Sequence, residues 1–249
     1  LFEKKLTLAL VSILFSFYIK ASLLIFLPIF AIIAIRQKYK LSDYVLSIVY
    51  CLVPIALFTL PFSKGNPLIW LYEIYKDKVF TQQLQVITAN AFNLWAGIAG
   101  IHERSHEILF GPLSYKNWGI ILFSLSYIPA LYLIYKKQDL KSIFWALSIT
   151  ALSSFMLLTN MHERYLYPFF PVFTILAVLD MKLMPLYWTI SGINLLNLYN
   201  FWWVPKINFL VSFLSFGDRL MPRILGLINF GIFGYLYHRF LRQTKPVKI

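Results

Sequence analysis

Charged residues are scarce in this sequence: only 13% of its 249 residues are Asp, Glu, Lys or Arg, whereas 59% are hydrophobic. The mean hydropathy of +0.69 is far above what a water-soluble domain of this size can carry on its surface. The shortage of charge excludes soluble folds, disordered tails and small secreted domains held by disulfides. We therefore predict an integral, multi-pass membrane protein.

Cysteine and acidic residues are also few. Cys51 is the single cysteine and lies in an apolar run, so the sequence offers no disulfide and no cysteine-based metal site. Asp and Glu number 10 against 23 Lys and Arg, which gives a net charge of +13. In a soluble chain this excess would suggest nucleic acid, but here the basic residues lie mostly between apolar runs, where they set membrane topology. We expect no nucleic-acid partner.

The beginning of the sequence has no methionine and no signal peptide. Residues 1–5 lead directly into an apolar run, without a short hydrophobic region followed by a small-residue cleavage site. We interpret residues 1–249 as the C-terminal part of a single transmembrane domain that begins farther upstream. We find no repeat period and no low-complexity segment.

Long apolar runs predict an all-α fold, a polytopic bundle with about eight membrane segments, since a bilayer core needs about 20 helical residues. The stretch 6–35 contains Lys20, which would be costly in lipid. A turn at Lys20 gives two short helices, 6–19 and 21–35, and places the lysine at the far membrane face. The other expected segments are 43–62, 119–135, 142–159, 165–180, 184–203 and 221–238.

The distribution of Lys and Arg predicts the orientation, because cytoplasmic connections are enriched in them. The connections assigned to the cytoplasm hold 13 Lys or Arg, and the outer ones hold 10 in a greater length. The long loop 63–118 then lies outside, and we expect interfacial helices in it, including the amphipathic stretch 68–75. The cytoplasmic connections are 1–5, 36–42, 136–141, 181–183 and 239–249.

The segment 159–165 carries the clearest polar signal on the outer side. His162 and Arg164 precede a run with Pro168 and Pro171, so we expect them near a helix N-terminus, which favours anions. A guanidinium binds phosphate oxygens bidentately, and an imidazole can donate a further hydrogen bond. These residues predict a phosphate site. The alternative is that Glu163 and Arg164 merely pair with each other or with neighbours at the interface.

A second group of polar and aromatic residues lies in the stretch 88–95. Asn90 and Asn93 are spaced for one helical face, with Phe92 and Trp95 on the neighbouring face. Amides that donate and accept hydrogen bonds beside aromatic rings suit a sugar. Helix capping and interface anchoring explain the same residues with fewer assumptions.

Residues 102–106 match the H-E-x-x-H pattern of zinc metalloproteases. That pattern needs a stable helix with two histidines one turn apart and a third ligand, whereas here it lies among glycines in a short connection. We expect His102 and His106 on the loop surface and no cofactor; a divalent metal is left open but is not indicated.

Three stretches resemble the GT-C superfamily of glycosyltransferases, polytopic enzymes that take a sugar from a polyprenyl-phosphate carrier on the outer or lumenal face. The stretch 161–168 is the most specific. It is similar to the His-Glu-Lys segment of dolichyl-phosphate-glucose-dependent glucosyltransferases, and closer to prokaryotic relatives of the protein-mannosyltransferase type. Arg164 replaces the lysine of the eukaryotic segment. The other two stretches are the run around Lys20 and Leu27-Pro28, and residues 90–95.

The resemblance implies inverting transfer of a mannose- or glucose-type hexose to a glycan, lipid or protein acceptor, in the plasma membrane of a prokaryote. The family places a catalytic carboxylate in an acidic first outer loop. This sequence has no such loop, so we expect the base upstream and the chain inactive alone. The resemblance assigns the donor phosphate to His162, Arg164 and Lys20, and substrate contacts to Glu163, Asn90, Asn93 and Trp95.

Two other classes of function remain open. A transporter or flippase of lipid-linked saccharides would also be polytopic and basic, but should carry paired charges or broken helices near the bilayer midplane. The later runs here are apolar with isolated Ser, Thr and Asn. A metalloprotease that uses residues 102–106 is the third hypothesis.

Overall fold

The chain is helical over 77% of its length in a computed structural model, which describes residues 5–77 and 84–244. The only strands in these ranges form one short hairpin, β1 (Leu109–Phe110) and β2 (Leu113–Ser114). The predicted all-α class is therefore confirmed. The chain divides into two compact units, Leu1–Gln83 and Leu84–Ile249, called unit 1 and unit 2 below and described separately.

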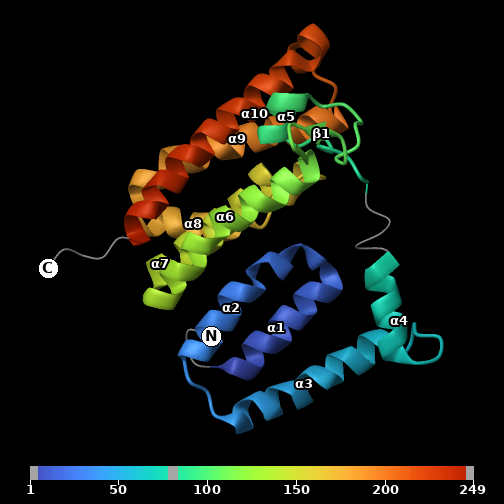
Figure 1. Cartoon of the computed structure of the whole chain (residues 1–249), viewed down its shortest axis with the longest axis vertical. Helices are drawn as coiled ribbons and strands as arrows, with labels where there is room; N and C mark the ends of the chain where they lie inside the picture. The colour runs from blue at the N-terminus through green and yellow to red at the C-terminus, as the bar shows by residue number, and fades with distance from the viewer. Residues whose placement is uncertain (1–4, 78–83, 245–249) are drawn as a thin grey trace, which may run out of the picture. The chain divides into compact units, whose positions relative to one another are not determined.

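Unit 1 is built from apolar helices around a turn at Lys20 (Figure 1). Lys20 has an extended backbone, with φ of −163°, and ends the helix at residues 6–19, as predicted. The expected segment 21–35 is a 3₁₀ helix at residues 21–26 followed by an α-helix. Helix α1 packs on α3, where the hydroxyl oxygens of Thr7 and Ser47 lie 2.9 Å apart. The elements are α1 (Leu6–Ile19), the 3₁₀ helix η1 (Ala21–Phe26), α2 (Leu27–Arg36), α3 (Leu41–Thr59) and α4 (Pro67–Ile74).

Helix α4 confirms the helix expected at 68–75 in the long connection. Asn66 caps it, because its Oδ1 accepts hydrogen bonds from the backbone N–H groups of Leu68 and Ile69. Pro67 occupies the first turn, where a missing N–H costs nothing. The predicted loop 63–118 runs across the boundary between the units, so only its later part belongs to unit 2.

Unit 2 is a helix bundle around α7. Fifteen of the 18 residues of α7 are buried, and α5, α6, α8 and α10 all contact it. Small residues permit close helix approach: a Cβ built on Gly119 of α6 would lie 2.9 Å from the Leu157 carbonyl oxygen. The elements are α5 (Leu94–Ala99), α6 (Tyr115–Lys136), α7 (Leu140–Leu157), η3 (Glu163–Leu166), α8 (Phe169–Leu179), η4 (Met181–Leu183), α9 (Met184–Trp202) and α10 (Asn208–Thr244).

Two predicted segments differ from the structure by more than a shift of up to four residues at an end. The segment 165–180 begins within the 3₁₀ helix η3, and α8 starts only after Pro168, since Pro168 and Pro171 lack the N–H that a continuous α-helix would use. The segment 221–238 lies inside the longer α10. That helix is interrupted at residues 216–219, where three successive residues from Gly217 have positive φ.

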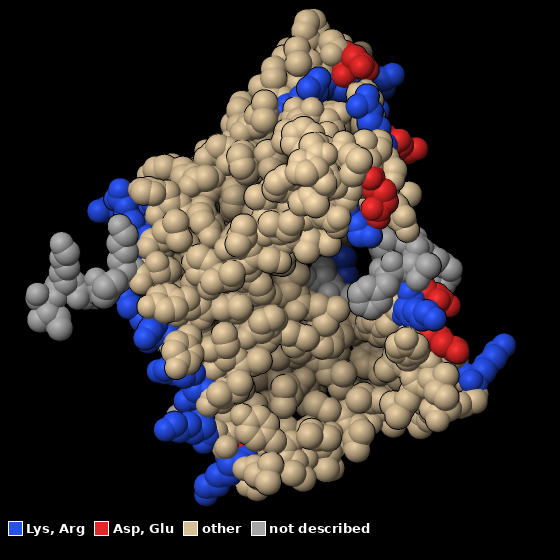
Figure 2. All heavy atoms as spheres, in the orientation of Figure 1, with Lys and Arg blue, Asp and Glu red and all other residues tan. Residues whose placement is uncertain are grey.

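Four of the described helices, α3, α6, α7 and α10, are long and apolar enough to cross a membrane. Leu6–Ile19 and Leu23–Arg36 are shorter apolar helices. In Figure 2 the Lys and Arg of unit 2 gather toward its two ends, with a broad surface free of charged residues in view between them. These features support the predicted membrane protein, whereas α8 and α9, which complete the expected eight segments, are not among the four.

The connections within unit 2 gather at its two ends. At one end Asp180 accepts a hydrogen bond from Lys141 (3.1 Å) and lies 3.8 Å from Arg239. Helix α7 then runs roughly 27 Å, at 1.5 Å per residue, to the end that holds residues 158–164. Within unit 2, these contacts place the connections around Lys141, Asp180 and Arg239 at the end opposite residues 160–164, as predicted for that part of the chain. Which end faces the cytoplasm stays a prediction.

Candidate functional site

An extended segment, residues 86–93, forms the base of the candidate site in unit 2. The Ile87 N–H donates to the Arg104 carbonyl (2.8 Å), and the Ala89 N–H donates to the Met161 carbonyl (2.9 Å). A bridge also pairs Asn90 with His162. The sequence presented the stretches 88–95 and 159–165 as two separate candidates, and the fold brings them together.

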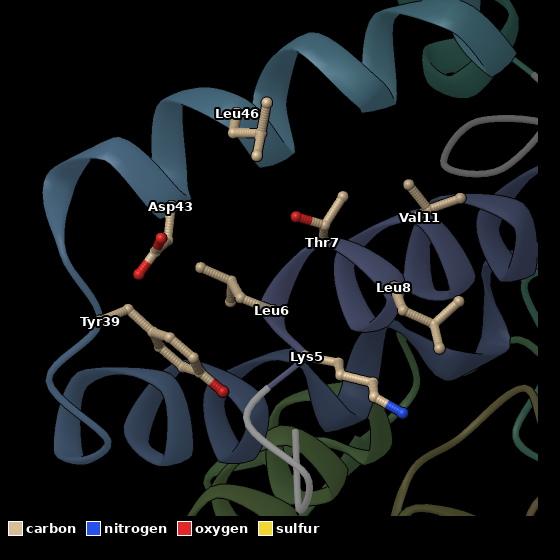
Figure 3. A pocket seen from close by; sticks show the side chains of 8 residues that line it. All are labelled: Lys5, Leu6, Thr7, Leu8, Val11, Tyr39, Asp43 and Leu46. Carbon is tan, nitrogen blue, oxygen red and sulfur yellow. The ribbon is translucent and has the colours of Figure 1, made fainter.

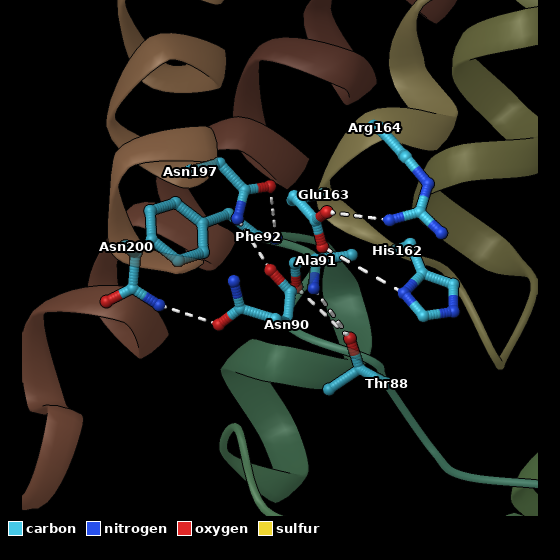
Figure 4. A network of polar contacts seen from close by, with 9 residues as sticks. All are labelled: Thr88, Asn90, Ala91, Phe92, His162, Glu163, Arg164, Asn197 and Asn200. Carbon is cyan, nitrogen blue, oxygen red and sulfur yellow. Dashed lines mark hydrogen bonds and ion pairs between the residues drawn. The ribbon is translucent and has the colours of Figure 1, made fainter. Parts of the chain in front are cut away.

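Asparagine side chains from α9 and α10 hold this segment in place, and Figure 4 shows the two from α9. The Asn197 Oδ1 accepts from the Phe92 N–H (3.0 Å), and its Nδ2 donates to the Asn90 carbonyl (2.6 Å). Asn200 Nδ2 donates to Asn90 Oδ1 (2.6 Å), and Asn229 Nδ2 donates to the Phe92 carbonyl (2.9 Å). These amides provide the hydrogen bonds that a neighbouring strand would otherwise supply.

The helical face expected for Asn90 and Asn93 does not form. Asn90 has a φ of +66°, which no α-helix contains, and α5 begins only at Leu94. Asn93 instead caps α5, because its Oδ1 accepts from the Ala96 N–H (3.1 Å). The capping alternative is therefore correct for Asn93.

Asn93 and Trp95 are enclosed by protein, with exposed fractions of 0% and 1%. The Asn93 side chain donates to the Phe155 carbonyl (3.1 Å), and the Trp95 indole donates to the Leu157 carbonyl (2.7 Å). These bonds fasten α5 to the end of α7. Neither side chain can reach a sugar in this structure, which argues against their predicted substrate contacts and favours a structural role.

The residues His162, Glu163 and Arg164 place two nitrogen-bearing side chains around a buried carboxylate (Figure 4). Glu163 Oε1 accepts from Arg164 Nη1 (3.3 Å), and its Oε2 lies 3.9 Å from His162 Nδ1. The Glu163 side chain is fully buried, whereas the exposed fractions of His162 and Arg164 are 16% and 44%.

The burial of Glu163 gives it a different role from His162 and Arg164, because only the latter two side chains are partly exposed. An enclosed carboxylate is placed to act through its neighbours, and this geometry gives no support to the direct substrate contact predicted for Glu163. Glu163 holds the guanidinium of Arg164, as the pairing alternative expects, while the Arg164 side chain stays 44% exposed. Binding of a phosphate by Arg164 and His162 stays a prediction.

Lys20, the third residue predicted to bind the donor phosphate, belongs to unit 1. It lines a hollow of about 300 Å³ whose other walls include Trp70 and Tyr75. The Tyr75 hydroxyl donates to the Phe17 carbonyl (2.8 Å) and fixes one wall. The role of Lys20 alongside His162 and Arg164 stays a prediction.

A larger hollow of about 520 Å³ lies between the start of α1 and the start of α3 (Figure 3). Lys5 and Asp43 contribute the charged groups of its lining, and leucines from both helices are among its apolar residues. We do not assign the candidate site to this hollow, because its lining brings together neither a phosphate-binding nor a sugar-binding set of side chains.

The H-E-x-x-H match lacks the helix that a zinc protease requires, since residues 101–106 are not helical. His102 Nε2 lies 3.9 Å from the Asp218 carboxylate, whereas His106 Nδ1 lies 3.3 Å from the Thr159 hydroxyl. His106 is also buried, so the loop-surface prediction was wrong for it. Burial lowers its pKa from the ordinary value, and the charge of Glu107 only partly opposes this.

The sequence analysis missed the asparagines of α9 and α10. Asn194, Asn197 and Asn200 follow one another at intervals of three, which places them on one helical face. This spacing in an apolar run could have indicated the contacts of α9, because amide side chains that face the protein interior need hydrogen-bond partners. Asn229 has no comparable spacing, and only the folded structure identifies it.

No protein-family model, curated protein or solved structure matches this chain. A functional assignment therefore depends on the geometry of residues 86–93 and 160–164, together with the sequence resemblance of residues 161–168.

Proposed function

We propose that this chain is part of an integral membrane glycosyltransferase. It would transfer a mannose- or glucose-type hexose from a polyprenyl-phosphate carrier to a glycan, lipid or protein acceptor on the outer membrane face. The observation that carries the proposal is the arrangement of His162 and Arg164 around the buried carboxylate of Glu163. This set of side chains, at one end of the helix bundle, suits the binding of a phosphate.

Arg164 supplies the main phosphate contact in this proposal. Its guanidinium has five N–H donors, and the bond to Glu163 uses only one side of it. The remaining donors suit the oxygens of a phosphate that gains negative charge as its bond to the sugar breaks. His162 adds a second donor beside it.

The asparagine contacts give this site its rigidity. Asn197 and Asn200 fix Asn90, and the bridge from Asn90 to His162 passes that constraint to the proposed phosphate site. A fixed site loses little entropy when it binds the reacting groups. The resemblance assigns the base that accepts the acceptor's proton to a carboxylate in an acidic outer loop.

The test is donor turnover by the full-length protein in liposomes that contain polyprenyl-phosphate mannose or glucose. His162→Ala and Arg164→Ala each remove a charge-assisted contact worth roughly 1.5–3 kcal/mol. Each change should lower turnover about ten- to a hundredfold. Arg223→Ala is the control, since Arg223 lies outside residues 160–164 and its guanidinium contacts the carbonyls of Gly97 and Ile98, at 3.5 and 3.4 Å.

The comparison among the three variants decides the proposal. If Arg223→Ala lowered turnover as much as Arg164→Ala, arginines in unit 2 would act generally on folding or insertion. The phosphate role of Arg164 would then be withdrawn. Arg164→Lys keeps the charge but loses the bidentate geometry, so it should fall between wild type and Arg164→Ala.

Transport of lipid-linked saccharides is the second candidate, because α10 is interrupted at residues 216–219 and α9 carries buried asparagines. Interrupted helices form the binding sites of many transporters. Protein-dependent movement of a labelled lipid-linked saccharide between the leaflets of a liposome, without sugar transfer to an acceptor, would favour this candidate.

A further inference from the structure

A short hairpin in unit 2 presents apolar side chains to its surroundings. Strands β1 and β2 pair antiparallel, and the turn between them contains Gly111, whose φ is +67°. The exposed fractions of Ile108, Leu109 and Phe110 are 47%, 71% and 45%. Three successive exposed apolar residues in so short an element need an apolar partner.

The hairpin is attached firmly to the first turn of α6. The Trp118 indole donates to the Phe110 carbonyl (2.8 Å), and the Tyr115 N–H donates to the Ile108 carbonyl (3.1 Å). The rings of Phe110 and Tyr115 stack with their centroids 5.1 Å apart. The position of α6 therefore determines the position of the hairpin tip.

Helix α6 carries an apolar stripe on the face that Trp118 begins. Steps of three and four residues lead from Trp118 along this face to exposed side chains: Ile121, Leu125, Ile128 and Tyr132. Such steps place side chains in one row. Because α6 is long and apolar enough to cross a membrane, this row suits contact with lipid. The hairpin lies beside the start of the row, where Trp118 bonds to Phe110.

We propose that the hairpin, residues 108–113, inserts into the interfacial layer of the bilayer. Its apolar tip would enter the boundary of the acyl chains, while Trp118 and Tyr115 lie at headgroup level, where such rings are favoured. At the hairpin base the Lys116 ammonium pairs with Glu107 (2.8 Å), and both side chains are about half exposed. This ion pair suits the headgroup region. The insertion does not depend on the proposed enzymatic activity.

The experiment places a fluorophore on the hairpin of the full chain in liposomes of phosphatidylcholine and phosphatidylglycerol. Leu109→Cys supplies the labelling site, with Cys51→Ala to remove the native thiol. Glu103→Cys is the matched control, because Glu103 is an exposed polar residue preceding the same hairpin. Expression of both variants should be normal, since both side chains are exposed.

The expected result is a blue-shifted emission for the probe at position 109, with several-fold stronger quenching by spin-labelled lipid than at position 103 and weaker quenching by aqueous iodide. Equal iodide quenching at the two positions would place the hairpin in water and overturn the proposal. Protection of position 109 from both quenchers would show that protein covers it, and would overturn the proposal as well.

Discussion

Asn197 offers the sharpest test of how the candidate site is built. Its side chain is 1% exposed and makes two hydrogen bonds, one to the Phe92 N–H and one to the Asn90 carbonyl. Asn197→Leu removes the partner of the buried Phe92 N–H and of the part-buried Asn90 carbonyl, which costs about 1–3 kcal/mol for the first and about 1–2 kcal/mol for the second. The free energy of unfolding should therefore fall by about 2–5 kcal/mol, which lowers the midpoint temperature by roughly 4–20 °C.

The matched control is Asn194→Leu, three residues earlier on the same face of α9. Asn194 is buried, but its Oδ1 has no hydrogen-bond partner among the described residues. Replacing it with an apolar side chain should be neutral or stabilising.

The measurements are thermal unfolding in detergent and limited proteolysis after Arg104, a residue in the segment that pairs with residue 87. Asn197→Leu should melt earlier and be cut faster than Asn194→Leu. If the two leucine variants melt together, the asparagine contacts do not stabilise residues 86–93 and the account of a rigid site is wrong.

Two further predictions concern helix packing and pH. Gly226→Ala should destabilise by about 1–3 kcal/mol, because its Cβ would lie 2.7 Å from a backbone carbonyl oxygen; Gly231→Ala in the same helix, where a Cβ meets nothing within 4 Å, should not. Burial opposes ionisation of Asp180, but the hydrogen bond and charge of Lys141, with the charge of Arg239, outweigh it and hold the pKa of Asp180 below its ordinary value. This stabilisation is present above about pH 4 and is lost as pH falls through the lowered pKa. The midpoint temperature of Asp180→Asn should therefore fall less than that of wild type when the pH is lowered below about 4.

Structural features that are determined by residues within one short stretch of the chain could be predicted from the sequence. The turn at Lys20 follows from the cost of a charge inside an apolar run, and α4 follows from a local cap and proline. The same local reasoning was less successful at Asn90 and Asn93. Their spacing is compatible with a helix, but the bonds from α9 to residues 90 and 92 hold a non-helical backbone there, with Asn90 in the left-handed region.

The sequence by itself determined that this is an all-α membrane protein, because the length and apolarity of a run decide whether a helix suits a bilayer, and both are local. Only the tertiary structure decided which polar residues reach the surface. Glu163, Asn93 and Trp95 carry polar groups typical of substrate contacts, yet all three are buried. The reason is that burial and hydrogen bonding depend on distant partners: Asn93 meets a carbonyl 62 residues away, and Asn197 meets an N–H group 105 residues away.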